Sequence, residues 1–157
     1  MTSKRTFALG AGVTAIAATV ATPLLAGSAA ASTHSFTLRM HQVSDKTVDA
    51  TPSGFSVGDD EVQATRLTEG AKTVGWEDGD CLTVRVSTTS DQLCRFVFHL
   101  SGGELVATGT VRSGRSGPGS FVLAVTGGTR TYAAATGQAT ITAVDHGAVP
   151  VVIDAQY

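Results

Sequence analysis

The sequence predicts an all-β domain, and three observations support this fold class. After residue 31, no stretch keeps apolar residues at the i, i+3, i+4, i+7 spacing of an amphipathic helix. Short runs rich in Val, Thr and aromatic residues alternate polar and apolar side chains instead. Gly, Asp, Ser and Pro separate these runs at short intervals, as in an antiparallel meander. A meander closes into a barrel or stacks as a β-sandwich, and the periodicity alone does not distinguish the two.

About eight strands are expected along the chain. Nine runs supply them, of which the third is short: residues 36–43, 58–67, 72–76, 81–87, 92–100, 104–112, 121–125, 138–144 and 149–157. Residues 44–53 and 113–119 are expected to be loops. The acidic run Glu77-Asp78-Gly79-Asp80 is expected to be a turn between two strands, because Asp and Gly favour turns.

The first 31 residues have the three parts of a secretion signal. Lys4 and Arg5 precede an uncharged apolar run over residues 7–25, and the small residues Ala29-Ala30-Ala31 form a cleavage site. The alternative is a membrane anchor, since the run approaches the roughly 20 residues that span a bilayer. Thr, Gly and Pro23 dilute this run, so we expect a secreted, extracellular product with no stable membrane anchor after cleavage.

Residues 32–157 then form a single domain of ordinary size. The formal net charge of the whole chain is −2, and two of its positive charges lie in the signal. Such a balance offers no basic surface for a nucleic acid, so no nucleic-acid partner is expected.

Two cysteines, Cys81 and Cys94, remain in the exported part. An even number in an exported chain indicates a disulfide, which would stabilise the fold by roughly 3 kcal/mol in the chain-entropy model. The alternative is a pair of buried or reactive thiols.

No motif in the chain indicates a metal or another cofactor, and none is predicted. The histidines (His34, His41, His99 and His146) are scattered without the spacing of metal ligands, and the acidic runs lack the spacing of calcium loops. The glycine-rich run over residues 126–132 lacks the phosphate-loop pattern, so it is interpreted as a tight connection between strands.

That glycine-rich region carries a family resemblance. Residues 121–129 (FVLAVTGGT), followed by Tyr132, Gly137 and Gln138-Ala139-Thr140-Ile141, resemble a stretch of the allene oxide cyclase and dirigent superfamily. Upstream segments resemble further elements of that superfamily in the right order: Ser56-Val57-Gly58-Asp59, the stretch from Leu67 to Gly75, Gly79-Asp80-Cys81 and the stretch from Gly103 to Gly109. Together they span residues 55 to 145.

The resemblance implies an eight-stranded antiparallel β-barrel, in preference to the sandwich. It also implies an apolar internal pocket and assembly as a homodimer or homotrimer. The partner it implies is a small apolar or phenolic ligand.

The resemblance is less direct for catalytic residues. Cys81 matches the pocket cysteine of plant allene oxide cyclases, but Met40 and Gln42 stand where a glutamate and an asparagine are wanted. Val111 replaces the tyrosine, so the plant reaction is not expected. A bond between Cys81 and Cys94 would also make the matching cysteine structural. For the dirigent proteins, which use Asp, Arg and Tyr, this chain has Asp45, Arg39, Arg85 and Tyr132.

Two hypotheses follow. The first is a secreted cyclase or isomerase that acts by confining its substrate in the barrel, with Cys81, Arg85 and Tyr132 as catalytic candidates and Phe96 and Phe98 as pocket candidates. The second is a non-catalytic secreted barrel that binds a small ligand.

Overall fold

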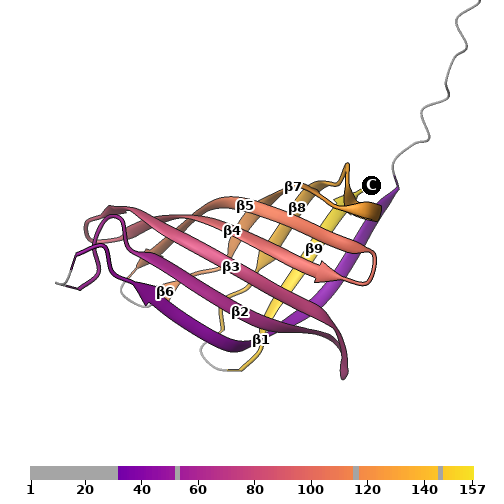
Figure 1. Ribbon diagram of the computed structural model, residues 1–157, viewed down its shortest axis with the longest axis horizontal. Coiled ribbons are helices and arrows are strands. Elements are labelled where there is room, and N and C mark those ends of the chain that lie inside the picture. The colour runs from indigo at the N-terminus through magenta and orange to yellow at the C-terminus, as the bar shows by residue number, and fades with distance from the viewer. Residues whose placement is uncertain (1–31, 52–53, 115–116, 145–146) are drawn as a thin grey trace, which may run out of the picture.

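The computed structural model describes residues 32–157 except 52–53, 115–116 and 145–146. Eight long antiparallel strands form nearly all of this part of the chain (Figure 1). Their bounds are β1 Thr33–Val48, β2 Asp60–Glu69, β3 Lys72–Val86, β4 Ser90–Leu100, β5 Gly103–Gly114, β7 Phe121–Gly128, β8 Thr136–Ile141 and β9 Val149–Gln156. A two-residue strand, β6 (Gly117–Pro118), pairs with the end of β5, and a 3₁₀ helix, η1 (Arg130–Tyr132), connects β7 to β8.

The strands close into a barrel. Each strand pairs with its neighbours in the order β4-β3-β2-β1-β9-β8-β7-β5, and pairing between β4 and β5 completes the ring. All pairings are antiparallel. The predicted all-β class is therefore confirmed. Because the sheet closes on itself, the fold is a barrel and not a sandwich. Closure also removes the unpaired strand edges that an open sheet exposes.

The strand predicted over residues 138–144 ends at Ile141, and the loop predicted over residues 113–119 contains the end of β5 and all of β6. Two other predictions are wrong because charged residues lie within strands. The predicted loop over residues 44–53 begins too early, since β1 continues to Val48 after a bulge between Gln42 and Ser44. The predicted turn at residues 77–80 does not exist. β3 runs straight through it, and each of these residues pairs with both β2 and β4.

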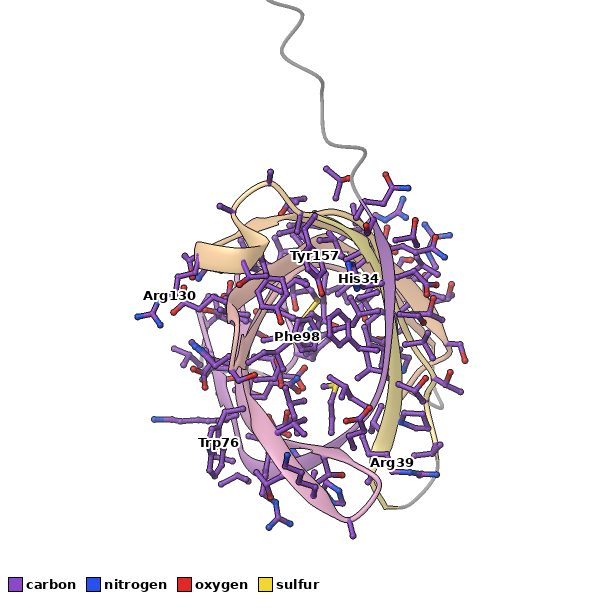
Figure 2. The ribbon with its side chains drawn as sticks, turned by 90° about the vertical axis from the view of Figure 1, so that its right-hand side faces the viewer. His34, Arg39, Trp76, Phe98, Arg130 and Tyr157 are labelled. Atoms are coloured by element: carbon purple, nitrogen blue, oxygen red, sulfur yellow. A yellow bond between two sulfur atoms is a disulfide. The ribbon has the colours of Figure 1, made fainter. Side chains whose placement is uncertain are left out.

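The inner face of the barrel holds the hydrophobic core. The fully buried members with less than 1% exposure are Leu67, Phe98, Leu105, Ala107, Leu123, Ala139, Val151, Ile153 and Ala155. Figure 2 shows the barrel from one end. Phe98 lies inside the ring of strands, and Arg39, Trp76 and Arg130 lie on its outer surface. The alternation of inward and outward residues along each strand produces this separation.

One end of the barrel is filled with aromatic rings, and we call it the aromatic end. Tyr132 and Tyr157 meet edge to face with ring centroids 4.9 Å apart, and His34 stacks on Tyr157 at 4.4 Å. Phe36 lies against both tyrosines at 6.3 and 6.4 Å. Such arrangements add about 0.5–1.5 kcal/mol per pair beyond the buried area. This end of the barrel is held together by aromatic packing.

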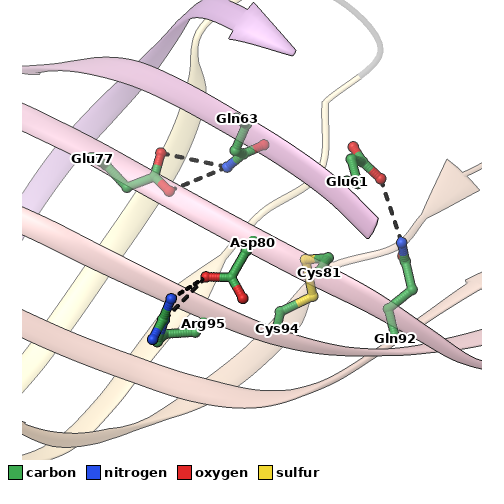
Figure 3. Close-up of a disulfide and its surroundings, with 8 residues drawn as sticks. All are labelled: Glu61, Gln63, Glu77, Asp80, Cys81, Gln92, Cys94 and Arg95. Carbon is green, nitrogen blue, oxygen red and sulfur yellow. Dashed lines mark hydrogen bonds and ion pairs between the residues drawn. A yellow bond between two sulfur atoms is a disulfide. The ribbon is translucent and has the colours of Figure 1, made fainter. Parts of the chain in front are cut away.

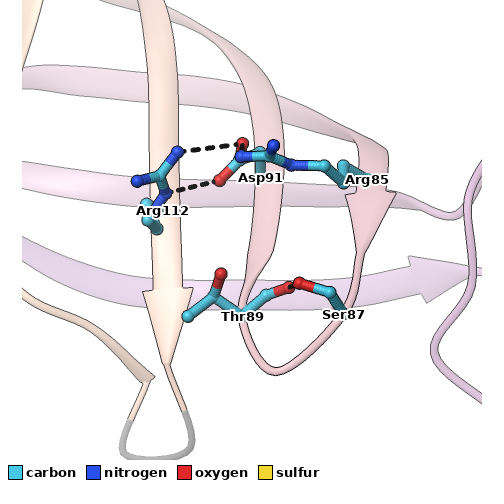
Figure 4. Close-up of polar contacts among 5 residues, drawn as sticks. All are labelled: Arg85, Ser87, Thr89, Asp91 and Arg112. Carbon is cyan, nitrogen blue, oxygen red and sulfur yellow. Dashed lines mark hydrogen bonds and ion pairs between the residues drawn. The ribbon is translucent and has the colours of Figure 1, made fainter.

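The outer wall carries paired charges. Asp91 accepts hydrogen bonds from Arg112 at 2.7 Å and from Arg85, so two cations on the flanking strands enclose one carboxylate (Figure 4). These arginines hold the pKa of Asp91 below its usual range. Asp80 pairs with Arg95 at 2.8 Å in the same manner. The outer wall thus places opposite charges on neighbouring strands, as sheets prefer.

In the part of the chain that the structure describes, no helix has the length and apolar character needed to cross a membrane.

Candidate functional site

A polar stripe interrupts the apolar inner face on β2, β3 and β4. Glu61, Gln63 and Thr65 occupy alternate positions of β2, so all three point to the same side of the sheet. Thr65 faces Glu77 of β3, and Gln92 of β4 donates a hydrogen bond to Glu61 at 3.4 Å. Figure 3 shows the contact of Gln92 with Glu61 and that of Gln63 with Glu77. Polar side chains inside a barrel are costly unless they are paired, so the stripe calls for a functional explanation.

Glu77 points inward because β3 is a regular strand at this position. Gly75, Gly79 and Cys81 share its face, whereas Asp78 and Asp80 alternate to the outer wall. A Cβ atom at Gly79 would lie 2.6 Å from Oε1 of Glu77 and 2.9 Å from the ring of Phe96. Only glycine therefore leaves room for the Glu77 carboxyl and the Phe96 ring to close over the backbone.

The Glu77 carboxyl is fully buried, with no exposed area. The Thr65 hydroxyl donates to it at 2.7 Å, and the Gln63 amide donates at 3.3 and 3.4 Å. Burial raises the pKa of Glu77 from its ordinary value of 4.5 to about 7, and these hydrogen bonds oppose the rise only in part. Near neutral pH, Glu77 is consequently able both to give and to take a proton.

A pocket of about 580 Å³ lies beside this carboxyl at the end of the barrel opposite the aromatic end. We call this end the pocket end. Phe96, Gln63, Met40 and Phe121 line it together with Pro118, Gly119, Ile141, Ala143, Val144 and Val149. Phe96 and Phe121 stack with ring centroids 6.4 Å apart, and Gln63 is the member that also contacts Glu77. The pocket is thus largely apolar with one polar group directed at it, as is usual for small-molecule sites.

A second hollow of about 360 Å³ opens at the same end of the barrel. Glu61 and Gln92 lie on one side of it, and the hydroxyl residues Ser87, Thr88, Thr89, Ser90 and Ser113 lie around its rim. Pro118 lines both hollows. The two spaces therefore adjoin, and hydroxyl side chains are concentrated around the smaller one.

The structure places the predicted catalytic candidates apart from one another. Cys81 and Cys94 are bonded to each other across β3 and β4, so no free thiol exists among the described residues. Arg85 is on the outer wall in the ion pair with Asp91. Tyr132 is buried at the aromatic end, where burial raises its pKa. The structure does not bring these three candidates into one site.

The two pocket candidates differ. Phe96 lines the pocket of about 580 Å³, whereas Phe98, two residues along β4, is buried in the core with no exposed area. Arg39 and Asp45, the residues suggested by the dirigent resemblance, are both exposed on β1. Asp45 pairs with Gln63 in register but lines neither of the two hollows.

The histidines of the described part lie away from the pocket. His41 contacts the Thr68 hydroxyl at 3.0 Å, and His99 lies between Asp78 and Glu104 on the outer wall. His146 falls outside the described residues. Among the residues that are described, no three His, Cys, Asp or Glu side chains are arranged to hold a metal ion.

Glu77 is the residue that the sequence predictions missed. Its acidic neighbours suggested a turn, although Trp76, Asp78 and Asp80 alternate with Glu77, Gly79 and Cys81 in a strand pattern. Extending the alternation of residues 81–87 backwards through the acidic run places Glu77 on the same face as Cys81. That signal was available in the sequence.

The comparisons with known proteins agree with this architecture. The solved structures it matches include a pyocyanin demethylase, with a TM-score of 0.67 and 27% identity over 78% of this chain and 99% of that one. A pterocarpan synthase dirigent protein matches with a TM-score of 0.62 and 20% identity over 88% and 96%. The chain has the fold of the dirigent-type barrels. No protein-family model matches the sequence, and no curated protein matches it either.

A Diels–Alderase from Streptomyces koyangensis also matches, with a TM-score of 0.63 and 18% identity over 83% of this chain and 71% of that one. The predicted resemblance to the allene oxide cyclase and dirigent superfamily is therefore confirmed as a resemblance of fold.

Proposed function

We propose that this protein is an exported cyclase- or isomerase-type enzyme that binds a small, largely apolar ring compound at the pocket end and moves a proton with Glu77. The observation that carries the proposal is the fully buried Glu77 carboxyl, whose pKa is about 7, behind an apolar pocket. A general acid or base works best when its pKa lies near the working pH. Burial of one carboxyl among apolar groups is a known way to reach such a value.

The contact between Gln63 and Glu77 gives the substrate access to the carboxyl. At 3.3 and 3.4 Å, the amide is held more loosely than the Thr65 hydroxyl at 2.7 Å. A polar group of the substrate can replace the Gln63 amide at the carboxyl while the ring lies against Phe96 and Phe121. Protonated Glu77 then donates its proton at one atom of the substrate and recovers a proton from another atom. The substrate is isomerised or cyclised, and the enzyme is unchanged.

Confinement supplies the rest of the rate enhancement in this proposal. The apolar walls hold the substrate in one reactive shape, and such positioning requires few polar groups. In this proposal the apolar walls position the substrate and one carboxyl moves the proton. Glu77 fits that role because burial raises its pKa.

A non-catalytic ligand-binding barrel is the second candidate. The observation that favours it is that Glu77 has no exposed area, so a ligand could fill the pocket and touch Gln63 without reaching the carboxyl. In the enzyme the ligand replaces the Gln63 amide at the Glu77 carboxyl, whereas in the binding barrel the hydrogen bond between Gln63 and Glu77 stays intact.

Export is part of the proposal. The order of charged, apolar and small residues in positions 1–31 supports it, as does the bond between Cys81 and Cys94, since disulfides persist in oxidising compartments. Intact mass of the protein from the culture medium tests it. A chain beginning at Ser32 is expected, and a chain that stays inside the cell with residues 1–31 attached contradicts it.

The enzymatic proposal is tested with protein recovered from its own culture medium. Native mass spectrometry identifies the co-purifying small molecule, and incubation with fresh protein shows whether it is converted. Pyocyanin, the compound named for one structural neighbour, is a purified probe of binding to the pocket, and the co-purifying molecule is the compound tested for conversion. Conversion by the wild type and a loss of about 10²-fold or more in Glu77→Gln are expected.

The matched control is Glu69→Gln, at the exposed end of β2 far from the pocket. Conversion that survives unchanged in Glu77→Gln overturns the role of Glu77. Binding without conversion by the wild type overturns the enzyme and supports the binding barrel.

A further inference from the structure

The smaller hollow at the pocket end, of about 360 Å³, has no part in the proposed proton transfer. Glu77 does not line it, and the rings of Phe96 and Phe121 belong to the larger hollow. Its volume lies at the low end of the roughly 300–1,000 Å³ that small-molecule pockets occupy. The smaller hollow therefore has room for one small ring beside the larger site.

The alternation of side chains along β4 directs polar groups into this smaller hollow. Ser90 and Gln92 lie on the same inward face of β4 as Phe96, and they are only 8% and 6% exposed. Ser113 of β5 lies directly opposite Ser90 in register, and both serines line the hollow. Two hydroxyls and one amide thus converge on it from neighbouring strands.

Glu61 of β2 completes this polar side of the smaller hollow. Gln92 donates a hydrogen bond to it at 3.4 Å, near the upper limit for such a bond. Among the described residues this is the one side-chain hydrogen bond of the pair, and it uses one amide N–H and one carboxylate oxygen. The second amide N–H, the amide oxygen and the second carboxylate oxygen therefore remain available to a ligand.

This set of groups suits a neutral ligand that carries several hydroxyls. Hydroxyl and amide side chains both donate and accept hydrogen bonds, and the carboxylate accepts them, so neighbouring hydroxyls of a sugar find partners of both kinds. An anionic group is disfavoured, because it would meet the Glu61 carboxylate. Arg85 and Arg112 offer such an anion no compensation, since they are bound to Asp91 on the outer wall and do not line the hollow.

The apolar part of the lining fits a sugar as well. Phe55, Val86 and Pro118 line the smaller hollow beside the hydroxyl residues. A pyranose ring has C–H faces and hydroxyl edges, so one face covers apolar side chains while the edge forms hydrogen bonds. Pro118 also lines the larger hollow, so a short link joins a group bound in one space to a ring bound in the other.

We propose that the smaller hollow is a subsite for a sugar ring and that the ligand of this barrel is an aromatic glycoside. The apolar ring lies against Phe96 and Phe121 in the larger hollow. The sugar lies in the smaller one, where its hydroxyls bind Glu61, Gln92 and the two serine hydroxyls. This inference rests on the proposed function, since it names the substrate class of the same site.

The test uses three compounds that share one naphthyl group. 2-Naphthyl β-D-glucopyranoside carries the sugar, 2-(tetrahydropyran-2-yloxy)naphthalene carries the same six-membered ring without its hydroxyls, and 2-methoxynaphthalene carries neither. Fluorescence titration of the full chain at pH 7.5 gives the three dissociation constants. The glucoside is expected to bind at least about tenfold more tightly than the tetrahydropyranyl ether, because each hydrogen bond to the sugar is worth about fivefold in affinity.

Variants then assign this preference to the smaller hollow. Gln92→Leu keeps the size of the side chain and removes its amide, and the double variant Ser90→Ala/Ser113→Ala removes the paired hydroxyls. Each is expected to weaken binding of the glucoside by about fivefold or more and to leave binding of the tetrahydropyranyl ether unchanged, which also shows that the variant is folded. Thr110→Val, on the exposed outer face of β5, is the matched control and leaves all three constants unchanged.

Saturation-transfer NMR locates the sugar independently. In the wild type, the protons of the sugar ring are expected to receive saturation from the protein about as strongly as the naphthyl protons do. This signal of the sugar falls in Gln92→Leu. Saturation confined to the naphthyl protons in the wild type overturns the inference, because the sugar would then lie in solvent.

The outcomes separate this inference from the proposed function. Equal or tighter binding of the tetrahydropyranyl ether overturns the inference and leaves the proton transfer by Glu77 standing. A preference for the glucoside that survives in both Gln92→Leu and the serine double variant also overturns it. Unchanged conversion in Glu77→Gln with that preference intact supports the inference and removes only the catalytic role of Glu77. If none of the three compounds binds, the inference fails together with the ring site in the larger hollow.

Discussion

The two ends of the barrel are built by different means. At the aromatic end, Tyr132, Tyr157, Phe36 and His34 pack against one another, and the adjoining core residues are almost all buried. At the pocket end, the interior contains Glu77 with Gln63 and a hollow of about 580 Å³. The aromatic end is filled by packed side chains, whereas the pocket end leaves a hollow beside a titratable group. Incomplete packing beside such a group is common at functional sites.

The largest expected effect follows from the difference in packing. Leu105→Ala removes a side chain with no exposed area from the well-packed half of the barrel. We expect a loss of about 3–4 kcal/mol in the free energy of unfolding, measured by chemical denaturation. Val144→Ala, at the pocket end, removes a side chain that is 42% exposed and is expected to cost about 0.5 kcal/mol. Equal losses in the two variants would contradict the contrast between the ends.

The next effect is a dependence of stability on pH. The folded protein raises the pKa of Glu77 from 4.5 to about 7, so the folded state binds the proton more tightly than the unfolded state. Below about pH 4.5 the carboxyl is protonated in both states and does not lower the free energy of unfolding. As the pH rises from 4.5 through 7, the buried carboxyl lowers that free energy increasingly. The difference between the two pKa values corresponds to about 3 kcal/mol in the free energy of unfolding at high pH. Denaturation of the wild type and Glu77→Gln at pH 5 and pH 8 should show the variant gaining relative stability at pH 8, and parallel curves would contradict this.

The disulfide gives an effect of similar or smaller size. Cys81 and Cys94 are 13 residues apart and join β3 to β4 toward the pocket end, where apolar packing is thinner. Replacing both by serine should lower the free energy of unfolding by about 2–3 kcal/mol. The reduced wild type should lose a comparable amount. A reduced protein as stable as the oxidised one would show that packing alone is sufficient there.

The smallest effect tests the hydrogen bond to Glu77. Thr65→Val removes the hydroxyl that donates at 2.7 Å while keeping the shape of the side chain. We expect a loss of about 1 kcal/mol in stability. The pKa of Glu77 should rise further, because this bond lowers it. Thr73→Val, on the exposed part of β3, is the matched control. A pKa that falls in Thr65→Val would contradict the assigned geometry.

The fold was more predictable than the site. Alternation along residues 81–87 and 92–100 predicted paired strands, and β3 and β4 pair there with the two cysteines opposite each other. Alternation states only that two faces differ. Leu82 and Val84 of the predicted apolar row lie on the outside, at 42% and 40% exposure, whereas Val86 follows a bulge between Thr83 and Arg85 and lines the smaller hollow. Which row faces inward depends on barrel closure, and closure depends on long-range pairing between β1 and β9.

The site escaped prediction for a related reason. Cys81, Arg85 and Tyr132 were chosen by residue type, and the strands carry them to the inner wall, the outer wall and the aromatic end. The high pKa of Glu77 comes from burial by residues far away in the sequence, so no local pattern contains it. Phe96 was named as a pocket residue, and the structure places it there. The secretion signal and the assembly as a homodimer or homotrimer stay predictions.

The protonation of Glu77 is the property from which the proposed chemistry follows, and it is directly measurable. Carboxyl carbons of the full chain, labelled with ¹³C-glutamate, are followed by NMR as the pH is raised, and Glu77→Gln assigns the signal. The account predicts one glutamate that titrates at about pH 7. A Glu77 signal that titrates near its ordinary value of 4.5 would contradict the account, because the carboxyl would then carry no proton to transfer at neutral pH.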